Sequence, residues 1–130
     1  GREMLEFVCS VRSTADLDRG IAIAGLGEDI DRLIREYSQG MRRKMAIACA
    51  MVSKPPILIL DEALNGLDPS SVKRITTLLE KERDSGTIIM LSTHVLDTLE
   101  SRATRVLYIE DGDLIADCGI EGLADIRERL

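Results

Sequence analysis

The stretch that decides the fold runs from residue 57 to residue 69 and reads Ile57-Leu58-Ile59-Leu60-Asp61-Glu62-Ala63-Leu64-Asn65-Gly66-Leu67-Asp68-Pro69. Its four consecutive aliphatic residues predict a strand that is buried in a parallel sheet. The strand delivers two carboxylates, those of Asp61 and Glu62, to its carboxyl end. Open α/β sheets bind their ligands at this edge, so we expect the chemistry of the protein there.

Helices are expected on both sides of this strand. Ser38 is suited to cap a helix that runs to about Ser53, and Pro55-Pro56 stop it before the strand begins. Asp68-Pro69 is suited to begin a second helix that runs to about Asp84, and Thr87–Leu91 is another aliphatic strand. A strand, a helix and a strand in this order predict a right-handed parallel βαβ unit.

The two ends of the chain add shorter elements. The apolar spacing predicts amphipathic helices near the amino terminus, and Asp111-Gly112 predicts a hairpin turn. The expected elements are helices over Arg2–Arg12 and Asp16–Ala24, a short helix after His94, strands over Arg105–Glu110 and Asp113–Asp117, and a helical tail over Ile120–Leu130.

Length and composition limit the classes of protein to which the chain can belong. With 130 residues, 45% of them apolar and 31% charged, it is suited to form a folded soluble protein. The net charge of −6 opposes a nucleic-acid surface, which needs a basic face. Three cysteines without metal-type spacing (Cys9, Cys49 and Cys118) are expected to be buried, reduced thiols. No apolar run approaches the roughly 20 residues of a membrane-spanning helix.

The order of these segments resembles that of the ATP-binding cassette (ABC) ATPases. Tyr37-Ser38-Gln39-Gly40-Met41 is similar to the signature loop of that family, and Ile57–Glu62 is similar to its Walker B strand. Gly66-Leu67-Asp68 resembles the D-loop, and His94 resembles the switch histidine. The resemblance implies an α/β fold with the three-layer parallel-sheet core of P-loop NTPases. The core would be incomplete, with a helical-subdomain part over residues 1–53, and a catalytic part with a carboxyl-terminal β-hairpin over residues 54–130. Within the helical-subdomain part, the resemblance implies that Ile30–Glu36 is an extended approach to the signature loop.

The resemblance also implies roles for individual residues. Hydrolysis of a γ-phosphate needs a metal ion, a positioned water and donors around the phosphoryl oxygens. Asp61 is the candidate that holds Mg²⁺, through coordinated water, and Glu62 is the candidate general base. His94 would bond the γ-phosphate and the attacking water. The alternative for the two carboxylates is that they only cap the following turn.

The signature-like loop and the D-loop would serve an ATP molecule bound to a second cassette. The candidate nucleotide-binding residues are Ser38, Gln39, Gly40, Met41 and Asp68. The loop departs from the usual Leu-Ser-Gly-Gly-Gln at Tyr37, Gln39 and Met41, so we expect no side-chain hydrogen bond at Met41 of the kind that the final glutamine makes in the family. Arg42, Arg43 and Lys44 follow it, either as a solvated basic face or as part of an anion site at the helix start.

One motif is missing from the 130 residues. No Gly-x-x-x-x-Gly-Lys-Ser/Thr phosphate loop occurs in them, so the backbone cradle for the phosphates is absent. We therefore expect the chain to correspond to the carboxyl-terminal part of a cassette, with Gly1 at a truncation point, and to be inactive alone. Unpaired strand edges predict that it self-associates or closes the gap in its sheet by rearrangement. The pair of glycines at Gly25 and Gly27 does not make a dinucleotide-binding turn, because no strand precedes it and Ile30 stands where a third glycine belongs.

The function implied by the resemblance is ATP hydrolysis that drives membrane transport, with export as the direction. The implied cofactors are ATP and Mg²⁺. The implied partners are a second nucleotide-binding domain and a membrane permease, which would hold the protein at the cytoplasmic, inner face of the membrane, and no nucleic acid is expected. The alternatives are a DNA-repair or translation ATPase of the same family and a non-catalytic interaction module on the same scaffold.

Overall fold

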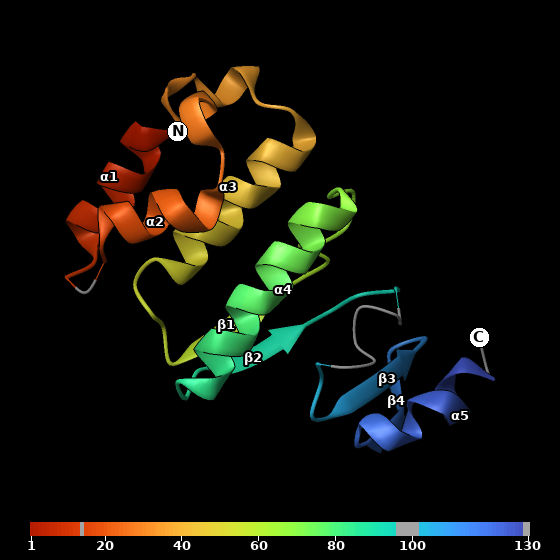
Figure 1. Cartoon of the computed structure of the whole chain (residues 1–130). Coiled ribbons are helices and arrows are strands. Elements are labelled where there is room, and N and C mark those ends of the chain that lie inside the picture. The colour runs from red at the N-terminus through yellow and green to blue at the C-terminus, as the bar shows by residue number, and fades with distance from the viewer. Residues whose placement is uncertain (14, 96–101, 129–130) are drawn as a thin grey trace. The chain divides into compact units, whose positions relative to one another are not determined.

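A computed structural model describes residues 1–13, 15–95 and 102–128 of the chain. These residues form two compact units, Gly1–Ser92 and Thr93–Leu130, each with a hydrophobic core of its own (Figure 1). The division expected from sequence, between residues 53 and 54, falls inside the first unit. The helix expected after His94 falls on residues 96–101, outside the described residues.

The first unit contains four α-helices at the places where the apolar spacing predicted them. They are α1 (Arg2–Val11), α2 (Leu17–Ala24), α3 (Gln39–Met51) and α4 (Pro69–Asp84). Three of them begin with a side chain that accepts a hydrogen bond from a backbone N–H of the first turn: Asp16 for α2, Ser38 for α3 and Asp68 for α4. Gly25 ends α2 in the left-handed conformation, with φ of 57°.

The segment between α2 and α3 differs from the sequence prediction. Residues 30–36 were expected to be extended, but the structure forms two 3₁₀ helices, η1 (Gly27–Asp31) and η2 (Ile34–Glu36). Its backbone N–H groups find local acceptors, as in the bond of 3.1 Å from the Tyr37 N–H to the Ile34 carbonyl. Since β1 and β2 pair only with each other, no neighbouring strand takes these hydrogen bonds, and tight turns satisfy them instead.

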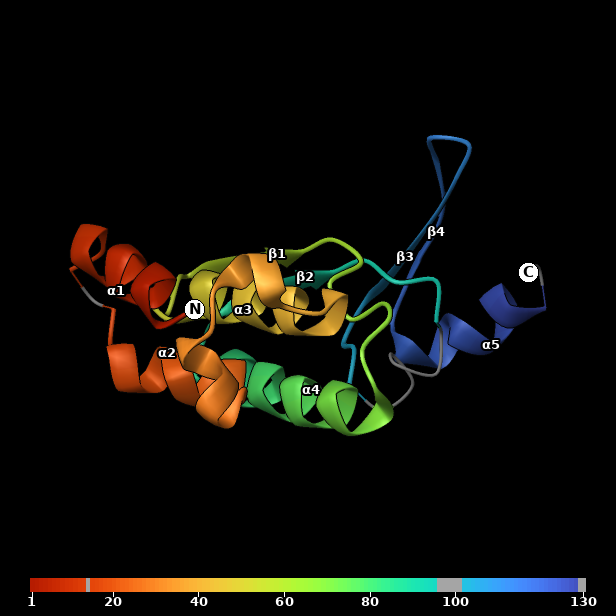
Figure 2. The ribbon, with the colours of Figure 1, turned by 90° about the horizontal axis from the view of Figure 1, so that it is seen from above.

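Strands β1 (Ile57–Leu60) and β2 (Ile88–Leu91) pair in parallel, with Ile57 opposite Ile88 and Leu60 opposite Leu91. Helix α4 connects them, which confirms the βαβ order. In Figure 2, α3 and α4 lie on the same side of the strand pair. Leu58 and Leu60 point to that side and join the core. The parallel pair therefore carries residues 61 and 92, just beyond its carboxyl ends, at one edge of the unit.

The other face of the strand pair is open, which corrects the prediction of a fully buried strand. Ile57, Ile59, Ile88 and Met90 are 54%, 67%, 61% and 51% exposed. Successive side chains of a strand point to opposite faces, so a single layer of helices covers only every second residue. Within Gly1–Ser92, the described residues form a layer of helices on one face of the strand pair and leave the other face uncovered.

The second unit is a hairpin followed by short helices. Strands β3 (Val106–Glu110) and β4 (Asp113–Cys118) are antiparallel, and Asp111 and Gly112 make the turn with φ of 50° and 89°. This confirms the hairpin predicted from the Asp-Gly pair. η4 (Ile120–Gly122) and α5 (Leu123–Arg127) follow, and Val106, Leu123 and Ile126 form the core of the unit.

The cysteines and the membrane prediction can be compared with the structure directly. Cys9, Cys49 and Cys118 are free thiols, but they are half-buried, which corrects the expectation of full burial. Burial raises the pKa of the Cys49 thiol. Among the helices of the described ranges, none is long and apolar enough to cross a membrane.

Candidate active site at the carboxyl end of the parallel strands

The two candidate carboxylates meet a third residue at the end of the parallel strands. The N–H of Ser92 donates to the Leu60 carbonyl at 2.9 Å, which extends the strand pairing by one residue. The Ser92 hydroxyl then donates to Asp61 Oδ1 at 2.5 Å and accepts a bond of 2.8 Å from the Glu62 N–H. One hydroxyl therefore fixes both the Asp61 carboxylate and the backbone of Glu62.

Glu62 has an unusual backbone conformation, with φ of 46°. A non-glycine residue in the left-handed region carries strain of about 1 kcal/mol or more, and such residues cluster at functional sites. The conformation is held from both sides, by Ser92 at the N–H and by the Asn65 N–H, which donates to the Glu62 carbonyl at 3.1 Å. The chain turns sharply here, directly after the strand.

A hollow of about 500 Å³ opens beside these carboxylates. Its walls come from one side of α3, from β1 and from the turn after β1. The lining residues are Arg43, Ala46, Ile47, Ala50, Ile59, Leu60, Asp61, Glu62 and Ala63. Its wall combines apolar side chains of α3 and β1 with three charged groups, those of Arg43, Asp61 and Glu62.

The donor set at this edge fits Mg²⁺ held largely by water and phosphate. The Asp61 side chain is exposed and spends one hydrogen bond on Ser92. No group of three or more His, Cys, Asp or Glu side chains comes together in the described ranges, so the protein has no all-protein metal cage there. Mg²⁺ keeps several waters and takes one or two carboxylates plus substrate phosphates, and Asp61 can supply such a carboxylate.

The signature-like loop begins α3 in the same unit. The Ser38 hydroxyl accepts a bond of 3.2 Å from the Met41 N–H, and both Ser38 and Gln39 are exposed. Gly40 and Met41 are half-buried in the first turn. The first backbone N–H groups of a helix have no acceptor within the helix, so this end can donate to an anion.

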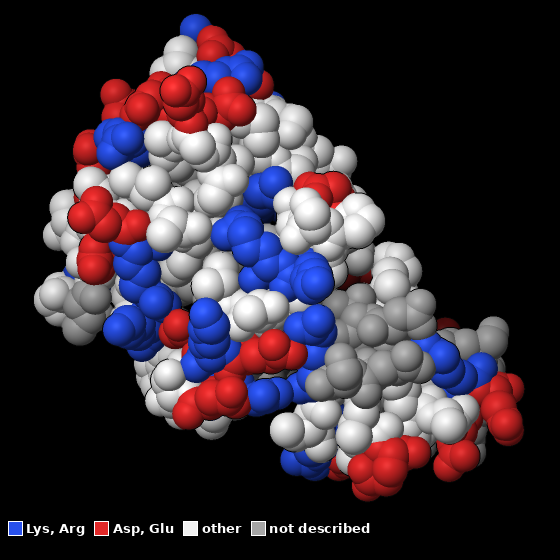
Figure 3. Space-filling model, viewed as in Figure 1, with Lys and Arg blue, Asp and Glu red and all other residues white. Residues whose placement is uncertain are grey.

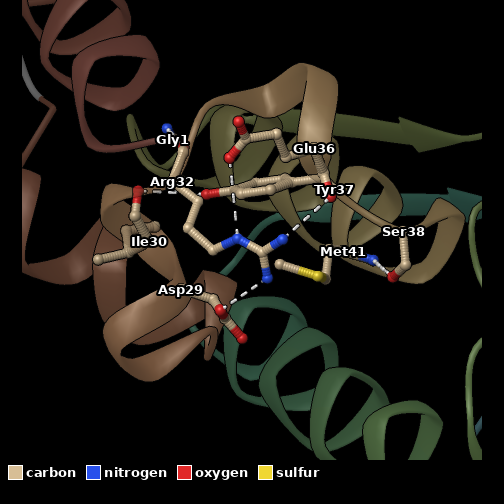
Figure 4. Close-up of polar contacts among 8 residues, drawn as sticks. All are labelled: Gly1, Asp29, Ile30, Arg32, Glu36, Tyr37, Ser38 and Met41. Carbon is tan, nitrogen blue, oxygen red and sulfur yellow. Dashed lines mark hydrogen bonds and ion pairs between the residues drawn. The ribbon is translucent and has the colours of Figure 1, made fainter.

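Tyr37 anchors this loop from behind. Its ring is 3% exposed, and its hydroxyl donates to the Ile30 carbonyl at 3.2 Å (Figure 4). Burial raises the pKa of the Tyr37 hydroxyl. Arg32 lies beside the ring and pairs with Asp29 at 3.1 Å, while its carbonyl accepts a bond of 2.8 Å from the amino group of Gly1. The tyrosine that replaces the usual leucine is therefore a core residue with an additional polar bond to η1.

The D-loop aspartate is held by the first turn of α4. Asp68 accepts bonds from the Ser70 hydroxyl at 2.5 Å, from the Ser71 N–H at 2.9 Å and from the Ser71 hydroxyl at 2.6 Å. These bonds, led by that from Ser70, lower the pKa of Asp68 well below its usual range. Lys44 approaches the same carboxylate at 3.6 Å. Asp68 therefore is the predicted helix cap, and it also contacts the signature helix.

The structure brings the signature-like loop and the D-loop into contact. A methyl group built on Gly40 would lie 3.8 Å from the Leu67 side chain and 4.0 Å from the Gly66 carbonyl. Arg43 Nη1 lies 3.6 Å from the position that a methyl group built on Gly66 would occupy. It is buried and without a hydrogen-bond partner among the described residues.

The three basic residues of α3 thus have separate surroundings. Arg42 donates to the Arg35 carbonyl at 3.1 Å, Arg43 faces the hollow and the D-loop, and Lys44 pairs with Asp68. They do not form one solvated face, and they do not converge on one point at the helix start.

His94 belongs to the second unit, Thr93–Leu130, and its side chain is exposed. Its role beside Glu62 remains a prediction from the sequence. Ser92, in contrast, was missed by the sequence reasoning, although it stands at the end of the second strand and two residues before the histidine. The available signal was a hydroxyl at the carboxyl end of the strand that follows, in sequence, the strand ending in Asp61 and Glu62.

The family of the chain follows from its similarity to known proteins. Residues 3–65 match the family model described as ABC transporter. A bacitracin transport ATP-binding protein from Enterococcus faecalis is 32% identical over an alignment of 127 residues, which covers 95% of this chain and 41% of the relative. The chain belongs to the ABC ATPase family. The matched range includes the signature-like loop and the Walker B strand, whereas Asp68 and His94 lie beyond it.

Solved ABC structures confirm the predicted fold class. The ATP-binding subunit of an ABC transporter superposes with a TM-score of 0.82 at 26% identity and covers 98% of this chain and 55% of the solved one. A dimeric ATP-binding cassette bound to ADP and phosphate superposes with a TM-score of 0.74 at 24% identity, over 80% of this chain and 45% of the solved one. The chain thus spans roughly half the length of these proteins or less.

Proposed function

We propose that this chain supplies the signature, Walker B and D-loop part of an ATP-hydrolysing subunit in an ABC transporter of the export type. The observation that carries the proposal is the joint placement of Asp61 and Glu62 by Ser92 at the end of a parallel strand. The bacitracin transport relative supports transport of an antibiotic-like compound as the task.

In the proposed reaction each residue has one task. Asp61 holds Mg²⁺, which neutralises phosphate charge when it is bound. Glu62 orients the attacking water and accepts its proton, a contribution of about 10²–10⁴-fold in rate. His94 donates a hydrogen bond to the γ-phosphate.

Ser38 and Gly40 would contact the γ-phosphate of an ATP molecule held by a second cassette. The Ser38 oxygen accepts from the Met41 N–H, so its hydroxyl hydrogen remains to be donated to a phosphate oxygen. The N–H groups of Gln39 and Gly40, at the start of α3, point along the helix axis in the same direction. Asp68 would take part in the contact between the two cassettes. The solved cassette bound to ADP and phosphate is dimeric, which supports this partner.

The remaining partner is a membrane permease, because the relatives are subunits of transporters and transport needs a membrane path. Binding to it would place the protein at the cytoplasmic face of the membrane. The 130 residues alone would be inactive, since they contain no phosphate loop.

The proposal can be tested in a chimera. The 127 aligned residues of the bacitracin transport relative are replaced by those of this chain, and Mg-ATP hydrolysis is measured. We expect hydrolysis, and a loss of about 10²–10⁴-fold in E62Q with retained ATP binding. E128Q, an exposed glutamate of the second unit, is the matched control and should keep its turnover. An active chimera whose turnover is unchanged by E62Q would remove Glu62 from its role.

Calorimetry on the 130-residue chain tests whether its own residues are enough to bind the nucleotide. With Mg-ATP we expect no measurable heat, because the phosphate cradle is missing. Micromolar binding by the chain would mean that the nucleotide is held by residues other than those proposed.

A further inference from the structure

Helices α1 and α3 pack against each other in the first unit and run in the same direction. At the start of α1, a methyl group built on Gly1 would meet the Tyr37 hydroxyl, and Tyr37 lies just before α3. At the end of α1, Arg12 donates to the Ser53 hydroxyl at 2.9 Å, just beyond α3. The two starts and the two ends are therefore neighbours.

Each of these helices carries a cysteine one turn before the contact at its end. Cys9 precedes Arg12 by three residues, and Cys49 precedes Ser53 by four. Residues three or four apart share a face of a helix, so each cysteine lies on the face that makes the Arg12–Ser53 contact. Leu5, one turn before Cys9 on the same face of α1, is fully buried, which shows that this face points into the unit.

The electrostatic surroundings of Cys49 agree with this placement. Burial raises the pKa of the Cys49 thiol, the charge of Cys9 raises it further, and the Arg12 guanidinium lowers it. Interactions between charges are largely screened beyond about 10 Å in salt, so Cys9 and Arg12 both lie near Cys49. Cys118 belongs to β4 of the second unit. The close pair of thiols is therefore Cys9 with Cys49.

The surroundings of the pair suit the chemistry of two thiols. Both are half-buried, so a small reagent can reach them. A structural zinc site takes four ligands, whereas no group of three or more His, Cys, Asp or Glu side chains comes together in the part of the chain that the structure describes. Figure 3 shows acidic and basic side chains interspersed over the visible face of the first unit, so no field of one sign keeps a small charged disulfide away.

We propose that Cys9 and Cys49 form a redox-sensitive dithiol, which a low-molecular-weight disulfide such as oxidised glutathione converts into an intrachain disulfide between α1 and α3. Burial makes Cys49 the poorer first nucleophile, so the Cys9 thiolate attacks one sulfur of the oxidant, forms a mixed disulfide and releases one glutathione thiolate. The Cys49 thiolate then attacks the Cys9 sulfur and releases the second. The protein loses two electrons and two protons, and one oxidised glutathione becomes two reduced ones.

The disulfide would join α1 covalently to the helix that begins with the signature-like loop. In a reducing compartment both thiols stay free, and the bond forms only where a low-molecular-weight disulfide accumulates. The proposed ATPase reaction uses neither cysteine. Failure of the chimera and failure of this dithiol are therefore separate outcomes.

Oxidation of the complete 130-residue chain tests the proposal. The reduced chain is incubated with an excess of oxidised glutathione, once folded and once in urea, and is then alkylated and analysed by mass spectrometry. Trypsin places the three cysteines on separate peptides, because Arg12, Lys44 and Arg105 lie between them. We expect the Cys9–Cys49 disulfide in the folded chain at about tenfold or more the yield in urea, because folding raises the effective concentration of one thiol at the other.

C118A is the matched control and should give the same disulfide in the same yield. C9A and C49A should each stop at a mixed disulfide between glutathione and the remaining member of the pair. Far-UV circular dichroism should show that each variant is folded and that oxidation leaves the helices intact. The proposal would be overturned by a folded chain that carries glutathione on Cys9 and Cys49 without joining them, by pairing of either with Cys118, or by an equal yield in urea.

Discussion

Replacing Ser92 by alanine removes the hydroxyl that connects the Asp61 carboxylate to the backbone N–H of Glu62. The variant loses the bond of 2.5 Å to Asp61 and the bond of 2.8 Å from the Glu62 N–H. A hydrogen bond to a charged group contributes roughly 1.5–3 kcal/mol and a neutral one roughly 0.5–1.5 kcal/mol. Both groups are exposed, and water replaces part of each bond, so we expect S92A to lower the free energy of unfolding by about 1–2 kcal/mol.

Urea unfolding of the 130-residue chain, followed by far-UV circular dichroism, measures this loss. S92T keeps the hydroxyl and should recover most of it. T93A is the matched control, because among the described residues the Thr93 hydroxyl oxygen accepts one local bond, of 3.0 Å from the Val95 N–H. We expect T93A to cost less than S92A. A free energy of unfolding in S92A within about 0.3 kcal/mol of the unmodified chain would refute the reasoning, as would equal losses in S92A and S92T.

Three further perturbations test other parts of the first unit. Y37F leaves the buried Ile30 carbonyl without its donor and should cost about 1–2 kcal/mol in the same assay. The folded-state pKa of Tyr37 is raised, so the unfolded chain ionises first and stability falls as pH rises above about 10, a loss that Y37F should reduce. R74A removes bonds of 2.8 and 3.2 Å to carbonyls in the last turn of α2 and should cost about 2 kcal/mol, whereas retained stability would contradict this. The Asp68 pKa is lowered in the folded state, so the stability that this carboxylate contributes is present above the pKa of the unfolded chain and is lost as pH falls through the folded-state pKa. S71A removes one of the bonds to Asp68 and should raise the Asp68 pKa in an NMR titration.

Much of the fold could be predicted because local rules and the tertiary structure agree. The caps at Asp16, Ser38 and Asp68, and the turn at Asp111-Gly112, depend on backbone groups within a few residues of each side chain. The segment at Ile30–Glu36 was predicted wrongly because its conformation depends on burying Ile30, at 2% exposure, and on the Tyr37 hydroxyl that bonds it. No periodicity within seven residues contains that information.

The sequence by itself determined the family resemblance, the identity of the carboxylates and the order of strand, helix and strand. These depend on residue type and spacing, which are local properties. Only the tertiary structure decided that Ser92 joins Asp61 to Glu62, across 31 and 30 residues of sequence, and that Gly40 lies beside the D-loop. It also decided that one face of β1 and β2 is open and that α1 exposes Phe7. Burial and hydrogen bonding between distant segments depend on which elements pack together, and an apolar residue in the chain does not show which neighbour covers it.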